Sequence, residues 1–231
     1  MCGRYSVIPG ADKLAARFKV KPSHEFAGKV YNAAPTQPLP VITSAAPAEL
    51  QLFRWGLVPS WADDVKIASK MINARAETLT EKPAFKRLLA SRRCLVPADG
   101  FYEWKGKTGA KQPFRIALKT DELFAFAGLW DTWADNETGE VRNTFTIITT
   151  EANALLKPLH QRMPVILPQA EEQHWLAIDV SPTELLSLLK PLPDSQLKLF
   201  PVSPLVNSAS ANAPEMCEPV PELPIQGSLF D

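Results

Sequence analysis

The second residue of the chain has the most distinctive chemistry. Cys2 follows Met1, and a methionine before a small residue is the usual substrate for methionine removal, which would leave Cys2 with a free α-amine beside its thiol. Because the reference pKa is about 7.7–8.0 for an α-amine and about 8.5 for a thiol, part of each group is nucleophilic at neutral pH. The amine can condense with an aldehyde to an imine, and the thiolate can close on that imine as a five-membered thiazolidine. Cys94 and Cys217 are internal and are expected to be ordinary structural cysteines.

One of the three histidines stands in a context that suits proton transfer. His160 lies in the polar segment 158–164, between a helical pattern and an apolar strand, and loops of this kind present reactive groups. His24 lies in a loop rich in Lys, Pro and Ser and His174 lies on a helix, so both are expected to be solvated or packing residues. The histidines and cysteines are too scattered for the spacing of a metal site, and we expect neither a metal nor a cofactor.

Glu103 is a second candidate for acid and base chemistry. Phe101, Tyr102 and Trp104 surround it in sequence, and a carboxylate held among aromatic rings is desolvated, which raises its pKa toward a useful range. An alternating strand in which Glu103 faces water explains the same residues equally well. The spacing leaves both interpretations open.

Four side chains could bind a nucleic-acid strand. Arg4 and Arg75 could contact phosphates, and Trp55 and Trp61 could offer ring faces to bases. An Arg is more often a solvated surface group and a Trp more often a core residue, so each contact taken alone is weakly indicated. Asn73 precedes Arg75 by two residues and completes this group.

The elements that must position these residues are mostly strands. Short apolar or alternating runs bounded by turn-forming residues predict strands over 39–43, 51–57, 114–118, 123–129, 144–149, 163–167 and 197–202. Helices are predicted over 11–19, 82–91, 151–156, 169–177 and 182–190, the last with a capping box that begins at Ser181. Because strands outnumber helices and do not alternate with them, we expect an α+β fold with a largely antiparallel, open, barrel-like sheet. The proline-rich end predicts one domain over 1–220 and an extended or disordered tail over 221–231.

Composition excludes several classes of protein. Twenty-five Lys and Arg balance twenty-five Asp and Glu, which excludes a strongly basic nucleic-acid binder but not a local basic patch. No apolar run approaches the roughly 18 residues of a membrane span, and the first ten residues lack a signal pattern. We therefore expect a cytoplasmic protein.

Six ordered motifs resemble one known family. They are MCGRY at 1–5, YNAAP at 31–35, WGLVPSW at 55–61, INARAET at 72–78, PADGFYEW at 97–104 and HQRMPVIL at 160–167. Their order and spacing are similar to those of the SOS-response-associated peptidase family, the abasic-site processing proteins, from Cys2 to about Val220. One such motif would be weak evidence, whereas six in order cover nearly the whole chain.

The resemblance implies a reaction and four catalytic residues. Cys2, freed by self-processing of Met1, would capture the ring-opened aldehyde of an abasic site in single-stranded DNA as a thiazolidine, with strand cleavage by β-elimination as a side reaction. Asn73 would orient Cys2 and the sugar, and Glu103 would position the α-amine and act as acid or base. His160 would transfer protons during ring opening and reversal of the cross-link.

The resemblance also implies the DNA contacts. Arg4 and Arg75, and more weakly Arg162, would contact phosphates, while Pro35 and Trp61 would stack on bases or wedge them apart. The expected partner is single-stranded DNA with abasic sites, bound by a monomer in the cytoplasm and on the nucleoid without a metal or membrane.

Two other functions fit Cys2. Met-Cys-Gly also begins the N-terminal-nucleophile amidohydrolases such as glutamine amidotransferases, in which the freed amine is the base for its own thiol. Those proteins need further motifs and a layered α/β/β/α fold, neither of which the sequence indicates. A non-catalytic binding domain with an incidental cysteine is the third hypothesis, and it predicts no reaction with aldehydes.

Overall fold

Five strands form a closed ring at the centre of the molecule. In the computed structural model, which describes residues 2–106, 111–135 and 137–222, the ring runs β4–β3–β6–β9–β10 and returns to β4. Four of its contacts are antiparallel, and β10 closes it by pairing in parallel with β4 through Thr144–Arg54 and Phe145–Trp55. The largely antiparallel, barrel-like α+β fold is thus confirmed, and the expected open barrel is closed by this one parallel contact.

The elements follow one another with few helices between them. The strands are β1 Tyr5–Val7, β2 Val30–Ala33, β3 Pro38–Thr43, β4 Ala46–Trp55, β5 Asn73–Arg75, β6 Arg93–Ala98, β7 Gly100–Lys105, β8 Gln112–Leu118, β9 Phe124–Ala134, β10 Val141–Glu151, β11 Arg162–Pro164, β12 Ile166–Leu167 and β13 Leu197–Pro201. The α-helices are α1 Ala11–Phe18, α2 Pro83–Ser91, α3 Glu172–Leu176 and α4 Pro182–Ser187.

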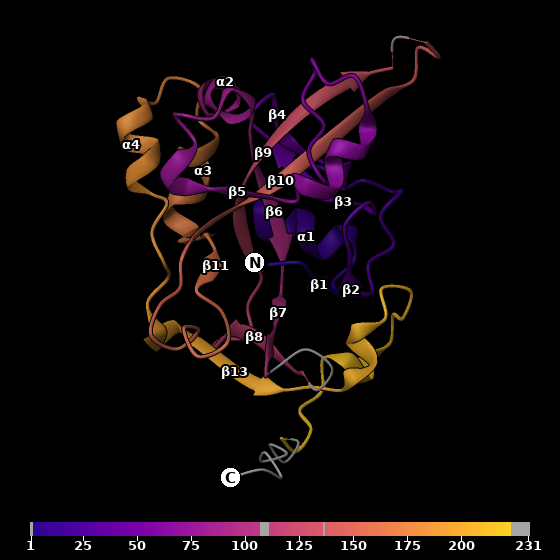
Figure 1. Cartoon of the computed structure of the whole chain (residues 1–231), viewed down its shortest axis with the longest axis vertical. Coiled ribbons are helices and arrows are strands. Elements are labelled where there is room, and N and C mark those ends of the chain that lie inside the picture. The colour runs from indigo at the N-terminus through magenta and orange to yellow at the C-terminus, as the bar shows by residue number, and fades with distance from the viewer. Residues whose placement is uncertain (1, 107–110, 136, 223–231) are drawn as a thin grey trace, which may run out of the picture.

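A second sheet packs against the barrel. Its order is β13–β8–β7–β1–β2, and Figure 1 shows β1 and β7 near the middle of the molecule with β8 and β13 below them. The ring of Tyr5 in β1 lies 5.2 Å from that of Trp55 and 5.7 Å from that of Phe126, measured between centroids. These contacts join the start of the chain to the barrel core.

Asp99 marks the corner at which the chain passes from barrel to second sheet, between β6 and β7. Its carboxylate accepts hydrogen bonds from Ser6 Oγ at 2.5 Å, Ile8 N at 2.6 Å and Arg115 Nη2 at 2.7 Å. Arg115 lies so close to the strand that a side chain at Gly100 would meet its guanidinium at 2.7 Å. The start of the PADGFYEW motif is therefore a largely buried clamp that fixes β1 against β7.

Buried Arg93 ties the helices to the barrel. Its guanidinium donates to Leu89 O and Ala90 O at the end of α2 and to Trp175 O and Ala177 O at the end of α3. Carbonyls at helix C-termini carry partial negative charge and lack partners in the helix, so a cation satisfies them there.

One predicted helix is wrong, and most of the predicted C-terminal tail lies outside the described residues. Residues 151–156 end β10 and then form turns, because Glu151 still pairs with Arg162 of β11 and Ala152 N donates to Gln161 O at 3.0 Å, which keeps the start of the segment in strand pairing. The other predicted helices are present, and α4 has the expected capping box. Of the predicted tail 221–231, residues 223–231 lie outside the described residues. In the part of the chain that is described, no helix has the length and apolarity to cross a membrane.

Candidate active site

Cys2 and Asn73 meet at the junction between the second sheet and the barrel. Cys2 precedes β1 and is fully buried, and Asn73 begins β5, which pairs in parallel with β10 beyond the end of the β4 contact. Asn73 Nδ2 donates to Cys2 O at 3.0 Å and to Ile72 O at 2.7 Å. Asn73 Oδ1 is buried and accepts no hydrogen bond from the described residues. The amide thus fixes the backbone of Cys2 and keeps one acceptor uncommitted.

Glu103 is buried on the barrel-facing side of β7, not turned to water. Phe101 belongs to the main core, whereas Tyr102 packs with Val202 and Val206 in a separate cluster, so by strand alternation Glu103 shares the face of Phe101. Only 4% of Glu103 is exposed, and burial raises its pKa to about 7. At neutral pH this carboxyl can therefore both accept and donate a proton.

The charges of Cys2 and Glu103 interact. Burial is the main cause that holds the pKa of the Cys2 thiol far above its ordinary value, and the Glu103 carboxylate raises it further. Because the thiol is protonated at rest, it needs a base at the moment of reaction. Glu103 is a base whose charge already acts on this sulfur.

His160 has one ring nitrogen occupied by the backbone. Its Nδ1 accepts from Arg162 N at 2.9 Å, so the neutral ring carries its proton on Nε2. Burial lowers the pKa of His160, and the positive charges of Arg162 and Lys111 lower it further. Lys111 also acts on Glu103, so both titratable groups lie within the influence of one cation. A neutral His160 offers an N–H donor.

Arg4 is anchored but keeps donors for a ligand. Nη1 donates to Asn32 Oδ1 at 3.0 Å and Val206 O at 2.6 Å, and Nη2 donates to Asn207 O at 3.3 Å. Three of the five N–H groups are used, all on neutral acceptors, and no carboxylate pairs with Arg4 among the described residues. Within the described part of the chain the charge of Arg4 is uncompensated, and Nε and one Nη2 proton have no acceptor, so they can donate to an anion.

Arg75 and Arg162 differ in whether their charge is paired within the chain. Arg162 forms a two-point ion pair with Glu77 at 2.8 Å and 2.8 Å and donates to Thr149 O at 2.6 Å, so its charge is neutralised within the chain. Arg75 is exposed, and its side chain makes no hydrogen bond or ion pair within the described residues. The predicted phosphate contact of Arg162 thus competes with this ion pair, whereas Arg75 is uncommitted.

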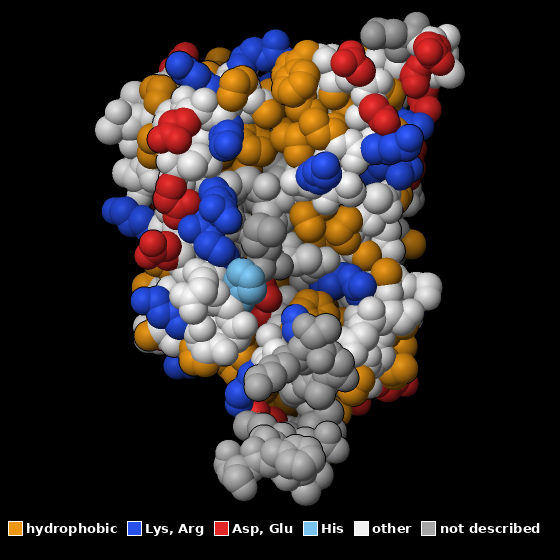
Figure 2. Space-filling model, in the orientation of Figure 1, with side chains coloured by type: hydrophobic (Ala, Val, Ile, Leu, Met, Phe, Trp, Pro, Cys, Tyr) orange, Lys and Arg blue, Asp and Glu red, His pale blue; other side chains and the backbone are white. Residues whose placement is uncertain are grey.

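Trp61 is displayed on an anchored loop. Its side chain is 60% exposed, while Ser60 N donates to Asp131 Oδ2 at 2.9 Å and Trp133 Nε1 donates to Ala62 O at 2.6 Å. Trp55, by contrast, is fully buried in the core and offers no face to a base. Figure 2 shows a hydrophobic area on the upper part of this face and Lys and Arg side chains around its middle.

Pro35, which was expected to contact bases, lies half-buried in the turn from β2 to β3. Sequence analysis did not select three further residues: Asn32, Glu77 and Asp99 hold Arg4, Arg162 and β1 in place. Each of the three stands inside a motif already noted, but only their partners, which are 28, 85 and 91 positions away, show what they do.

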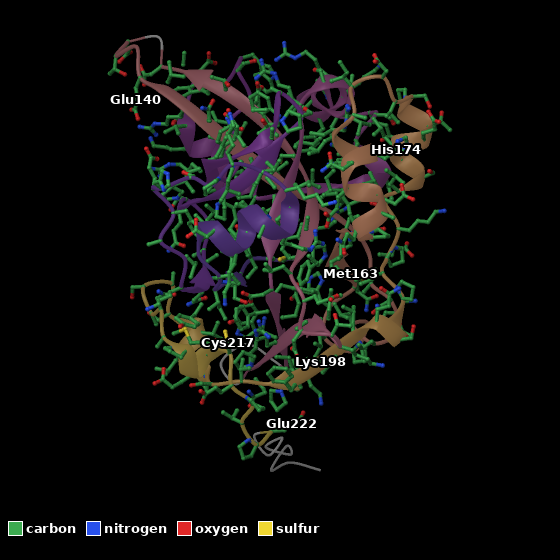
Figure 3. All side chains as sticks on the ribbon, turned by 180° about the vertical axis from the view of Figure 1, so that it is seen from behind. Glu140, Met163, His174, Lys198, Cys217 and Glu222 are labelled. Atoms are coloured by element: carbon green, nitrogen blue, oxygen red, sulfur yellow. The ribbon has the colours of Figure 1, made fainter. Side chains whose placement is uncertain are left out.

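The remaining cysteines and histidines lie elsewhere. Cys94 is buried in β6, and Cys217 contacts Tyr102 Oη at 3.1 Å on the far side of β7. Figure 3 labels His174 on α3 and Cys217 at the opposite end of the molecule, seen from behind. Among the described residues, no group of three His, Cys, Asp or Glu side chains could hold a metal ion.

Comparisons with known proteins agree on one family. The model of the family described as SOS response associated peptidase (SRAP) matches residues 1–209. Abasic site processing protein YoaM of Bacillus subtilis is 46% identical over 224 residues, which cover 94% of this chain and 98% of that protein. Abasic site processing protein HMCES of Xenopus tropicalis is 34% identical over 217 residues, covering 80% of this chain and 64% of that protein. A crystal structure of a Bacteroides thetaiotaomicron protein superposes with a TM-score of 0.88 at 33% identity, over 95% of this chain and all of that one.

Proposed function

The chain belongs to the SOS response associated peptidase (SRAP) family, and on this premise we propose that it captures abasic sites of single-stranded DNA as a covalent thiazolidine on Cys2. Relatives named abasic site processing proteins support the substrate class. The reaction requires that Met1 be removed, so that Cys2 has a free α-amine. We include this self-processing, reversal of the cross-link and a weak lyase activity in the proposal.

One observation carries it: a buried cysteine at the start of the chain, a carboxyl with a pKa of about 7 and an amide acceptor share one site. An internal thiol needs only a base. When an aminothiol captures an aldehyde, the first adduct must lose water and the product must then close a ring. These steps need a group that takes up one proton and returns it, which suits Glu103. Asn73 fixes the carbonyl of Cys2 and leaves Oδ1 for an N–H or O–H of the substrate.

The side chains of this site can supply and accept every proton that the proposed reaction moves. The α-amine of Cys2 adds to the aldehyde carbon of the opened sugar, and loss of water gives an imine. Glu103 then takes the thiol proton while the sulfur attacks the imine carbon, and the imine nitrogen receives a proton as the five-membered ring closes. The N–H of His160 donates to the oxygen that leaves as water, and in reversal the same groups act in the opposite order.

Recognition comes from the aldehyde and the phosphates, not from base edges. Intact DNA has no electrophile that an aminothiol captures, so any sequence with an abasic site is a substrate. Arg4 and Arg75 are cations with unused donors that can bind phosphates on either side of the lesion. At the imine stage the neighbouring C–H is acidified, which accounts for strand cleavage as a side reaction.

The test is a cross-linking assay with single-stranded DNA that contains one abasic site. We expect a heat-stable adduct with wild-type protein and with Cys94→Ser and Cys217→Ser, and none with Cys2→Ser. Cys2→Ser keeps an amine that can form an imine but lacks the sulfur that closes the ring. A heat-stable adduct with the Cys2→Ser variant would refute the assignment of Cys2 as the nucleophile.

A second arm tests the amine and the competing hydrolase. An uncleaved N-terminal extension turns the amine into an amide, which does not condense with aldehydes, so an N-terminally tagged protein should be inert and a C-terminally tagged one active. Equal yields from both would refute the mechanism. Incubation with glutamine should release no ammonia, because the barrel with a second sheet differs from the layered α/β/β/α fold of the amidohydrolases.

A further inference from the structure

Asn32, whose side chain accepts a hydrogen bond from Arg4, also lines a small cavity. It encloses about 280 Å³ between β2, the start of β3 and the segment Ala209–Asn212. Val30 and Leu39 supply apolar wall, while Asn32 and Gln37 supply amides. This volume is at the lower end of ligand pockets, which suits one flat heterocycle better than a whole nucleotide.

The walls of the cavity are held in place by hydrogen bonds. Asn32 Nδ2 donates to Ser208 O at 2.8 Å and Ala211 O at 3.0 Å. Asn212 Oδ1 accepts from Tyr31 N at 2.7 Å, and its Nδ2 donates to Lys29 O at 2.9 Å. The side chains of both asparagines are therefore engaged in hydrogen bonds within the chain, and the cavity is preformed.

Gln37 is the lining amide that keeps a donor. Its Oε1 accepts from Ala34 N at 3.0 Å, and its Nε2 makes no hydrogen bond within the described residues. The turn that carries it is strained, because Thr36 has φ 76° although a β-branched residue disfavours the left-handed region. Two backbone bonds to Trp55, from Thr36 N at 2.8 Å and to Gln37 O at 3.1 Å, hold this turn.

Arg4 is the neighbour that suggests the ligand. The Asn32 side chain that lines the cavity accepts from Arg4 Nη1 at 3.0 Å, so one residue separates the cavity from the uncompensated guanidinium. A phosphate held at Arg4 brings an attached base within reach of this cavity. Apolar walls and a single amide donor suit a base that is unpaired and unstacked.

We propose that this cavity binds the unpaired base of the nucleotide whose phosphate contacts Arg4, with Gln37 Nε2 donating to an acceptor on the base edge. This inference rests on the proposed function, because it assumes that the chain binds single-stranded DNA. It adds a base-dependent contact on one side of the lesion. Gln37 is then a binding residue, distinct from the group that performs the covalent chemistry.

The experiment measures affinity for oligonucleotides with a central tetrahydrofuran site, which has no aldehyde and so reports binding alone. In a set of such strands, the base is removed from one neighbouring nucleotide at a time. We expect one position at which loss of the base weakens binding of wild-type protein by about fivefold or more. In Ala211→Leu, which fills the cavity, and in Gln37→Glu, which keeps the acceptor and removes the donor, this ratio should fall below about twofold.

Ala27→Leu is the matched control, because it adds the same bulk to a separate hollow beside α1 and should leave the ratio unchanged. The ratio compares two strands on one protein, so the extra charge of Gln37→Glu cancels. No base-dependent position, or the same ratio in wild type and Ala211→Leu, would overturn the proposal. Cross-linking is scored separately on true abasic DNA: its loss with an intact base-dependent ratio refutes the proposed function and leaves the cavity site standing.

Discussion

Glu103 is the residue at which burial and proton transfer are most closely linked. A carboxyl that is almost fully buried holds its proton far more tightly than one in water, and its pKa of about 7 lies 2.5 units above the ordinary 4.5. Each unit corresponds to about 1.4 kcal/mol, so the ionised side chain costs the folded state of order 3–4 kcal/mol. The protein carries this cost at the place where a base is needed.

The stability of the protein should therefore depend on pH through Glu103. The unfolded chain loses this proton near pH 4.5 and the folded chain near pH 7, so the folded state holds the extra proton between these values and stability falls as pH rises across that window. Glu103→Gln has no charge to bury. We expect its free energy of unfolding to exceed that of wild type by roughly 3–4 kcal/mol at pH 8 and to match it near pH 4.

Urea unfolding at both pH values measures this difference. Glu81→Gln, at an exposed site, is the control and should shift stability little at either pH. A variant at Glu103 that is no more stable than wild type at pH 8 would contradict the burial argument.

Glu103 and His160 should also control the rate of cross-link reversal. Neither supplies the atom that forms the bond, so their loss slows formation and reversal without abolishing the adduct, in contrast to Cys2→Ala. A positioned acid or base contributes roughly 10²–10⁴-fold in rate. Adduct formed with Glu103→Gln or His160→Ala, followed by excess unlabelled abasic DNA, should exchange slower by a factor in this range. Wild-type exchange in both would mean that solvent carries the protons.

At the scale of elements, β5 and β11 bring two arginines to the site. Arg162 is ion-paired with Glu77, whereas the side chain of Arg75 has no ion pair within the described residues. Each phosphate contact on a single strand contributes about −0.7 to the slope of log affinity against log salt. Arg75→Ala should flatten that slope by about this amount, because Arg75 has no partner within the described residues. Arg162→Ala should leave the slope nearly unchanged and lower stability by up to about 1 kcal/mol, since it removes the ion pair with Glu77.

Binding titrations of the tetrahydrofuran strand at several salt concentrations separate the two arginines. Equal flattening by both variants would show that DNA displaces Glu77 from Arg162.

The clamp at Asp99 decides where β1, and with it Cys2, lies. The Asp99 carboxylate satisfies Arg115 at 2.7 Å as well as Ser6 and Ile8 of the β1 segment. Asp99→Asn leaves the buried Arg115 charge without a carboxylate, and we expect a loss of about 3–5 kcal/mol in the free energy of unfolding. Ser6→Ala removes a neutral hydroxyl, which contacts Asp99, Gly100 O and Arg115 Nη2, and should cost only about 1–2 kcal/mol. Similar losses from both variants, measured by chemical denaturation, would argue against a charge-dependent clamp.

At the scale of the whole molecule, a closed barrel and a second sheet leave the active groups at their junction. Cys2 comes from the segment before β1, Glu103 from β7, Asn73 from β5 and His160 from the loop before β11. No single element carries the site. Loosening either sheet would therefore separate Cys2 from Glu103, the nucleophile and base of the proposed function.

The last described residues close the second sheet. Val220 N donates to Pro201 O at 2.9 Å, and Lys105 pairs with Glu222 at 2.7 Å. We therefore predict that a chain truncated after Glu222 unfolds with the same free energy as the full chain and cross-links abasic DNA at the same rate. A chain truncated after Pro214 removes the buried Met216 as well and should be less stable. Loss of stability in the first truncation would place residues 223–231 in the folded domain.

The sequence by itself determined the fold class and predicted the chemistry of the proposed function. An aminothiol needs only Cys2 and the loss of Met1, and strands such as 39–43 and 144–149 follow from local apolar patterns that the barrel retains. Ordered motifs also predicted the family. Residues 151–156 were predicted wrongly because long-range pairing of Glu151 and Ala152 with the β11 segment outweighed a weak helical pattern.

Only the tertiary structure decided the burial and the interaction partners of the candidate residues. Whether Glu103 faces water depends on which side of β7 meets the barrel, and whether Arg162 is free depends on Glu77, 85 positions away. The same holds for the closure of the barrel, which needs the parallel contact between β4 and β10. Long-range pairing sets burial, and burial sets the pKa of Glu103, so the property that makes this carboxyl a usable base at neutral pH exists only in the folded chain.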